Sequence, residues 1–230
     1  MMQTLLFDSI PFTLSDAAII KGCHAENDDE QTALLLRLVA EARNVARPKA
    51  MVRIVMVEKI DDETVTLDGE TIRSRLVRVN LDKVHRAFAY VATCGAEAEA
   101  WSLTLPDMLE QFYADEIKKA LVHAAVMYAR EEVKKRFDPN GTLSVMSPGS
   151  LKAWPIENQK PLFRIMGDTQ GIIGVTLTDS CLMLPSKSVS GLLFSDTTGH
   201  VNCIMCPMEN CPGRRAPYDP THYEKNFAKK

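Results

Sequence analysis

Apolar positions recur at helical spacing in two stretches of the chain, and each stretch predicts an amphipathic helix. From Asp28 to Pro48 they follow a helical spacing after a start that resembles a capping box, and Pro48 ends this predicted helix. A second stripe of period 3.6 runs from about Pro106 to Phe137, and the sequence Asp-Pro-Asn-Gly at 138–141 stops it. We therefore expect two amphipathic helices, of which the second is the stronger.

Short stretches rich in β-branched and aromatic residues lie before and after the second helix. A turn at Asp68-Gly69 predicts a small hairpin, and Pro155 to Gly167 predicts a short helix because proline is accepted in a first helical turn. Helices and strands come in mixed order without a repeated strand–helix alternation, which indicates an α+β fold. The predicted strands are 50–57, 65–67, 71–72, 88–93, 143–146, 172–177 and 189–194.

Composition places the chain among ordinary globular proteins. It has 230 residues, a formal net charge of −3 and 46% hydrophobic residues, so nothing in the charge favours nucleic acid or an anionic membrane as partner. No apolar run reaches the roughly 20 residues needed to cross a bilayer, and the N-terminus lacks the pattern of a signal peptide. We expect a soluble cytoplasmic protein.

The segment 173–194, IGVTLTDSCLMLPSKSVSGLLF, resembles a segment of the activation (reactivation) domain family of cobalamin-dependent methionine synthase. The predicted long helix and the stretch 147–167 agree with this family in order and spacing, so the resemblance covers about residues 105–200. The positions of segment 173–194 that fit the family pattern are Gly174, Val175, Leu177, Thr178, Asp179, Ser180, Met183, Pro185, Ser188, Val189, Ser190, Gly191 and Phe194.

The resemblance implies a fold and a division of the chain. The fold is α+β, a mixed or antiparallel twisted sheet with a long central helix and flanking helices, followed by an irregular Cys-rich C-terminal tail. We divide the chain into an N-terminal α/β part (1–95), an activation-domain-like core of the same domain (96–200) and a Cys-containing extension (201–230). The last residues of this extension, 222–230, are expected to be a loose tail.

The resemblance also implies a function. Domains of this family bind S-adenosylmethionine and present its methyl group to a cobalamin that has been oxidised to cob(II)alamin, while an electron donor reduces the cobalt. A separate chain of this kind would act on a corrinoid-binding protein or a methionine synthase core, which contributes the cobalamin. The alternatives are a non-enzymatic metal- or cluster-binding docking module for a corrinoid protein, and an unrelated redox protein with the same fold.

The residues implied in cofactor binding follow from matching positions. The family's arginine before the Pro-Gly turn, which helps to hold the carboxylate of S-adenosylmethionine, is replaced here by Val145, and valine has no donors for a carboxylate. Lys152 or Arg164 could substitute. An alternative interpretation of Ser188, Ser190 and Gly191 is that they shape a bend in a strand. The predicted cofactor-binding residues are Pro148, Gly149, Ser150, Trp154, Asp179, Ser188, Ser190 and Gly191.

Three cysteines within nine residues, Cys203, Cys206 and Cys211, predict a thiolate site. Cys181 is the expected fourth ligand, with two histidines, 200 and 222, as competitors that would suit zinc. An iron–sulfur cluster or zinc is one interpretation, redox-active thiols are a second, and unliganded cysteines are a third. An iron–sulfur cluster would have a role, since reduction of cob(II)alamin needs an electron.

Overall fold

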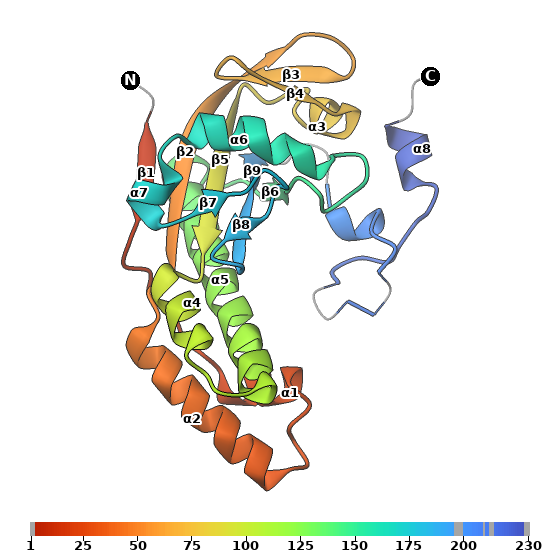
Figure 1. The fold of residues 1–230 in the computed structure, drawn as a ribbon. Helices are drawn as coiled ribbons and strands as arrows, with labels where there is room; N and C mark the ends of the chain where they lie inside the picture. The colour runs from red at the N-terminus through yellow and green to blue at the C-terminus, as the bar shows by residue number, and fades with distance from the viewer. Residues whose placement is uncertain (1–2, 196–199, 209, 212–213, 228–230) are drawn as a thin grey trace.

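An antiparallel sheet with one long helix packed along it organises the chain (Figure 1). The structure is a computed structural model that describes residues 3–195, 200–208, 210–211 and 214–227. Within these residues the large sheet has the strand order β4-β3-β2-β5-β9-β6, and β1 pairs with β2 beside β3. The strands of the large sheet are β1 (Thr4–Phe7), β2 (Lys49–Lys59), β3 (Thr64–Leu67), β4 (Glu70–Arg73), β5 (Arg86–Thr93), β6 (Leu143–Met146) and β9 (Ser188–Ser195).

Strand β2 is the longest strand of the sheet and pairs with three other strands. The first half of β2 pairs with β1, its last three residues pair with β3, and its other edge pairs with β5. The hairpin between β3 and β4 turns at Asp68-Gly69, where both residues have positive φ, as a two-residue type I′ turn requires. The predicted hairpin is therefore confirmed.

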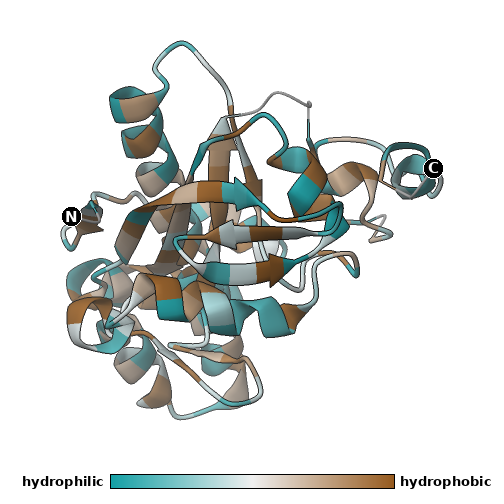
Figure 2. Ribbon diagram, turned by 90° about the horizontal axis from the view of Figure 1, so that it is seen from above, coloured by the Kyte–Doolittle hydropathy of each residue, from teal (hydrophilic) through white to brown (hydrophobic). Residues whose placement is uncertain are grey.

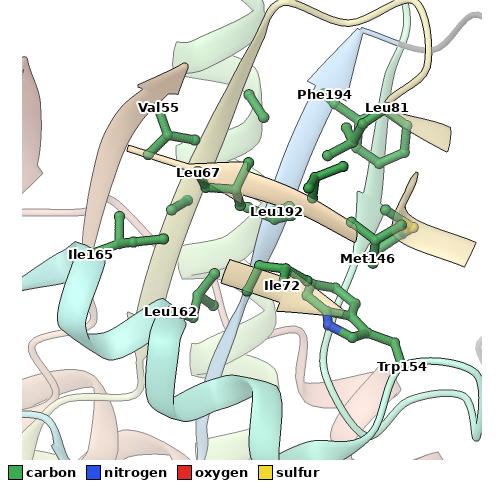
Figure 3. Close-up of a cluster of buried hydrophobic side chains, with 14 of the residues drawn as sticks. Val55, Leu67, Ile72, Leu81, Met146, Trp154, Leu162, Ile165, Leu192 and Phe194 are labelled. Atoms are coloured by element: carbon green, nitrogen blue, oxygen red, sulfur yellow. The ribbon is translucent and has the colours of Figure 1, made fainter. Parts of the chain in front are cut away.

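Helices cover both faces of the sheet and extend beyond one of its ends. Helix α5, capped at its start by the Asp107 carboxylate, packs on the face that holds Phe88 and Leu193. The elements α3 and α6 cover the opposite face, where Trp154 is buried (Figure 3). The helices are α1 (Asp16–Gly22), α2 (Asp29–Val45), α3 (Arg75–Asn80), α4 (Ala96–Leu103), α5 (Met108–Phe137), α6 (Gln159–Met166), α7 (Thr169–Ile173) and α8 (His222–Asn226).

Besides the apolar clusters on the two faces of the sheet, a third cluster lies between helices. Helices α1, α2 and α4 pack against the first half of α5, with residues such as Leu35, Leu38 and Ile117 at the centre. In Figure 1 this group lies below the sheet. Figure 2, which looks at the molecule from above, shows hydrophobic and hydrophilic residues alternating along the helices and strands. The predicted α+β fold, with its antiparallel sheet, long helix and flanking helices, is confirmed.

Two predicted elements differ from the structure. The stretch 172–177 was expected to be a strand, but α7 continues to Ile173, and only Thr176–Leu177 (β7) pairs, with Met183–Leu184 (β8). The Asp168 carboxylate accepts a bond from the Gly171 N–H and caps this helix, and Gly174 ends it in the left-handed conformation. Local capping therefore outweighs the β-propensity of the isoleucines.

Residues 222–227 also differ from the expected loose tail, whereas residues 228–230 of that stretch lie outside the described residues. They contain α8 (His222–Asn226), and the following Phe227 is 5% exposed and packs with Trp154 in the cluster on the α6 face of the sheet. The Arg75 Nε donates a hydrogen bond to the Phe227 carbonyl. The segment is therefore docked on the sheet domain as far as Phe227.

Candidate functional site

The turn after β6 carries the predicted Pro-Gly segment on a fixed backbone. The Gly149 N–H donates to the Trp154 carbonyl at 2.8 Å, and the Ser150 hydroxyl donates to the Ser147 carbonyl at 2.6 Å. Gly149 has φ +80°, a conformation that favours glycine, and an added Cβ would lie 3.1 Å from the Ile156 Cβ. In this turn Gly149 and Ser150 are exposed, whereas Pro148 is buried.

Residues 200–208, 210–211 and 214–218 lie beside this turn and are held by polar contacts. The Asn202 Nδ2 donates to the Ser150 Oγ at 3.3 Å, and the Ser144 hydroxyl donates to the His200 carbonyl at 3.0 Å. The guanidinium of Arg214 donates to several carbonyls of its own segment, those of Cys203 (2.9 Å), Cys206 (2.8 Å), Met208 (2.5 Å) and Ala216 (3.0 Å).

A cavity of about 550 Å³ lies between the turn and this C-terminal segment. We call it the turn–tail cavity. Its size falls within the range of small-molecule sites, and its wall combines apolar and aromatic side chains with a few polar groups, as such sites do. The residues that line it are Gly149, Ser150, Leu151, Lys152 and Ala153 from the turn, and Met205, Pro207, Tyr218 and Tyr223 from the tail.

The other predicted cofactor-binding residues lie elsewhere. Trp154 is 1% exposed in the core, and Asp179 lines a separate hollow of about 650 Å³ together with Arg164. Ser188 and Ser190 are buried in β9, and the Ser188 hydroxyl lies in bonding distance of the Thr93 hydroxyl (2.9 Å) and donates to the Pro185 carbonyl (2.8 Å). The structure therefore brings Gly149 and Ser150 to one cavity, whereas Ser188 and Ser190 lie within β9.

Val145 lies at a smaller cavity, of about 110 Å³, on the same seam between β6 and the tail. Two arginines, Arg130 from α5 and Arg215 from the tail, also line it. Of the predicted substitutes for the missing family arginine, Arg164 pairs with Glu70 at 2.7 Å, and Lys152 lines the turn–tail cavity.

Sequence reasoning missed the tail side of both cavities. The cysteines of the segment 203–211 suggested a metal site, so Met205, Tyr218 and Tyr223 were not considered as ligand contacts. Only Arg215 has a signal in the sequence, because the pair Arg214-Arg215 directly follows the cysteines. Such a pair could offset thiolate charge, bind a phosphate or carboxylate of a cofactor or partner, or be a solvated surface pair. No local pattern marks the other residues, because the contact between the tail and the turn joins positions more than 50 residues apart.

The cysteines show no preformed metal site. All six thiols are free, and among the residues described no three His, Cys, Asp or Glu side chains are grouped so that they could hold one metal ion. Cys181 is buried at the turn between β7 and β8 with φ +65°, while the three tail cysteines are partly exposed. A metal or cluster at Cys181, Cys203, Cys206 and Cys211 stays a prediction.

The thiols differ in their electrostatic surroundings. The Arg215 backbone N–H donates to the Cys203 Sγ at 3.4 Å and, with the Arg215 charge, lowers the pKa of this thiol. Burial raises the pKa of Cys94 to about 12 and that of Cys23 to about 11. Cys203 is therefore the thiol whose surroundings favour the thiolate.

No helix in the described part of the chain is both long and apolar enough to span a lipid bilayer.

Comparisons with known proteins agree with the fold and with the resemblance in the sequence. Residues 87–204, more than half of the chain, match the family described as vitamin B12 dependent methionine synthase, activation domain. One similar solved structure is titled "Crystal Structure of the MetH Reactivation Domain bound to AdoHcy". It is 16% identical, its TM-score is 0.63, and the match covers 87% of this chain and 80% of that chain. No curated protein matches the chain.

Proposed function

The chain belongs to the family of activation domains of vitamin B12-dependent methionine synthase, and we propose that it supports the reductive remethylation of an oxidised corrinoid, cob(II)alamin, held by a partner protein. The partner is a corrinoid-binding protein or a methionine synthase core. S-adenosylmethionine is the proposed methyl donor, and the proposed site for it is the turn–tail cavity.

The position of this cavity is the observation that carries the proposal. The turn that resembles the family's Pro-Gly segment, at Gly149 and Ser150, forms one wall of the turn–tail cavity. Tyr218 and Tyr223 offer aromatic surface to a nucleoside, and the Met205 thioether adds a flexible apolar contact. The similar structure of the MetH reactivation domain is titled as bound to AdoHcy, the demethylated product of the proposed donor.

The chemistry would belong to the two cofactors. One electron from an external donor reduces Co(II) to Co(I), and the methyl group then moves from the sulfonium to cobalt and leaves a thioether. The chain contributes position, because a methyl transfer between two bound cofactors depends on how their reacting atoms are held.

The test is the conversion of a corrinoid protein from the cob(II)alamin to the methylcobalamin state, followed by visible absorption. The mixture contains a low-potential one-electron donor and S-adenosylmethionine with a ¹³C-labelled methyl group, with and without the chain. We expect the chain to accelerate the conversion and the label to appear on cobalt. Equal rates with and without the chain, for both a methionine synthase core and a separate corrinoid protein, would contradict the proposal.

A further inference from the structure

Two arginines line the smaller cavity beside β6. Arg130 reaches it from α5 and Arg215 from the tail, and Val145 and His200 also line it. Its volume is about 110 Å³, which is enough for a small polar group but far less than the turn–tail cavity offers. We call it the arginine cavity.

Neither arginine has a carboxylate partner in the part of the chain that the structure describes, although the Arg215 charge acts on the Cys203 thiol and lowers its pKa. No aspartate or glutamate lines the arginine cavity, and no ion pair of Arg130 or Arg215 is present there. Several other arginines are matched by carboxylates, for example Arg164 by Glu70. A bound anion would neutralise the positive charge that these two residues bring to the wall of the cavity.

Arg130 is held in place without losing most of its donors. Its Nη2 donates to the Leu143 carbonyl at 2.5 Å, which fixes the guanidinium beside β6. A guanidinium has five N–H donors, so the others remain for a ligand, and its planar fork suits the two oxygens of a carboxylate. Arg215 is exposed, and its side chain interacts with the Cys203 thiol. Its other donors likewise remain for a ligand.

The arginine cavity and the turn–tail cavity lie along one seam. Val145 lines the first and Gly149 the second, and these residues are separated by the start of a single turn. On the tail side, Val201 lines the first and Met205 the second. A ligand bound along the seam can therefore place one end at the tyrosines and the other end toward the arginines.

We propose that Arg130 and Arg215 bind the carboxylate of the amino-acid end of the ligand whose nucleoside end occupies the turn–tail cavity. This inference rests on the proposed function for the identity of the ligand as an S-adenosyl amino acid. The two arginines come from α5 and from the tail, whereas Val145, at the position of the family's arginine, lies in β6. This anchor explains how the chain can hold a carboxylate although valine stands before its Pro-Gly turn.

The experiment compares two ligands that differ at this end. S-adenosylhomocysteine carries the carboxylate, and 5′-methylthioadenosine has the nucleoside and the sulfur without it. Calorimetry on the full chain measures both for the wild type, Arg215→Gln and Arg130→Gln. Arg47→Gln is the matched control, because the Arg47 Nη1 also donates to a backbone carbonyl, that of Ala46 at 2.7 Å, and Arg47 lines neither cavity. Thermal melts check that each variant is folded.

We expect Arg215→Gln and Arg130→Gln to weaken binding of S-adenosylhomocysteine about 10- to 100-fold each, the range of a hydrogen bond to a charged group. Binding of 5′-methylthioadenosine should stay within about twofold of the wild type. Arg215→Lys should have an intermediate effect because it keeps the charge and loses the fork.

The outcomes separate the two proposals. If the wild type binds both ligands and the two Arg→Gln variants bind S-adenosylhomocysteine as well as the wild type, the anchor is wrong while the nucleoside site stands. The same holds if the variants weaken both ligands equally. If the wild type binds neither ligand, the proposed methyl donor is wrong, and the anchor is overturned with it.

Discussion

Gly191 of β9 runs so close to Met146 of β6 that a Cβ on Gly191 would lie 2.3 Å from the Met146 carbonyl oxygen. The same Cβ would lie 2.8 Å from the Ser147 Oγ and 3.0 Å from a ring carbon of Tyr90. The contact with Met146 is to backbone, which cannot swing aside as a flexible side chain can. Glycine is therefore required here by the close approach of β6, at the point where the chain enters the turn of the candidate site.

Gly191→Ala tests this requirement. The strand must shift to admit the methyl group, and overpacking of this kind costs about 1–3 kcal/mol. We expect urea denaturation to show a loss of free energy of unfolding in this range. The control is Gly22→Ala near the end of α1, where an added Cβ meets only the Glu116 Oε2, at 3.8 Å. If both variants unfold at the same urea concentration, the close approach does not constrain position 191.

Much of the sheet and of the long helix followed from local patterns. The Asp68-Gly69 turn and the stripe that ends near Phe137 are set by neighbours within a few residues, so the sequence could predict them. The pairing of β9 with both β5 and β6 was not predictable in this way, because it joins strands separated by tens to about a hundred residues.

In the candidate site, too, the sequence predicted what lies within one local segment and missed contacts between distant segments. The resemblance led to Gly149 and Ser150, which do line the turn–tail cavity. Trp154 belongs to the same segment but supports the core, because a motif shows that a residue matters and not which way its side chain points. The tail residues Met205 and Tyr218 could be found only from the structure, since their contact with the turn depends on how Phe227 docks.

A buried ion pair ties α4 to α5. The Lys118 ammonium, whose side chain is 7% exposed, donates to the Glu99 carboxylate at 2.8 Å and to the Ser102 hydroxyl at 2.9 Å. Lys118→Met leaves the partly buried Glu99 without its cation, and we expect a loss of about 3 kcal/mol in the free energy of unfolding. Chemical denaturation measures it.

Lys119→Met is the matched control for this change. Lys119 pairs with Glu116 at 2.9 Å, but its side chain is 58% exposed, so solvent screens the pair. We expect a change of less than about 1 kcal/mol. Equal effects of the two substitutions would show that the buried pair adds nothing beyond a surface pair.

The docking of the tail depends on Phe227. Its ring stacks on Tyr223 at 5.7 Å between centroids and packs into the cluster that contains Trp154. Phe227→Ala removes this contact, and truncations of buried phenylalanine cost about 3–5 kcal/mol. Because Phe227 joins the tail to the sheet domain, we expect the loss to appear as release of the tail.

Hydrogen exchange measures that release. In Phe227→Ala the amides of the tail, such as that of Asp219, which bonds the Ile204 carbonyl at 2.8 Å, should exchange faster than in the wild type. Amides of β5 should be unchanged. Unaltered protection of the tail would mean that the Arg214 contacts and the bond from Asn202 hold it without Phe227.

The order in which the thiols react with iodoacetamide follows from their surroundings. The thiolate is the reactive form, so Cys203, with its lowered pKa and partial exposure, should be alkylated early at pH 8. Cys94 is fully buried and its pKa is raised to about 12, so almost none of it is thiolate at that pH. Peptide mapping by mass spectrometry should find Cys94 labelled only after unfolding. Early labelling of Cys94 in the folded chain would contradict this assignment.

Substitution of two methionines of the tail tests whether the tail contacts the ligand. One of them lines the turn–tail cavity and the other does not. Met205 lines the turn–tail cavity and packs against the core, whereas Met208 is 63% exposed and does not line it. Met205→Ala removes several buried methylene-sized groups from the wall, at about 0.8 kcal/mol for each such group. We therefore expect about 10-fold weaker binding of S-adenosylhomocysteine, by calorimetry, for Met205→Ala. Met208→Ala should bind as the wild type does, and equal affinities for the two variants would remove the tail from the binding site.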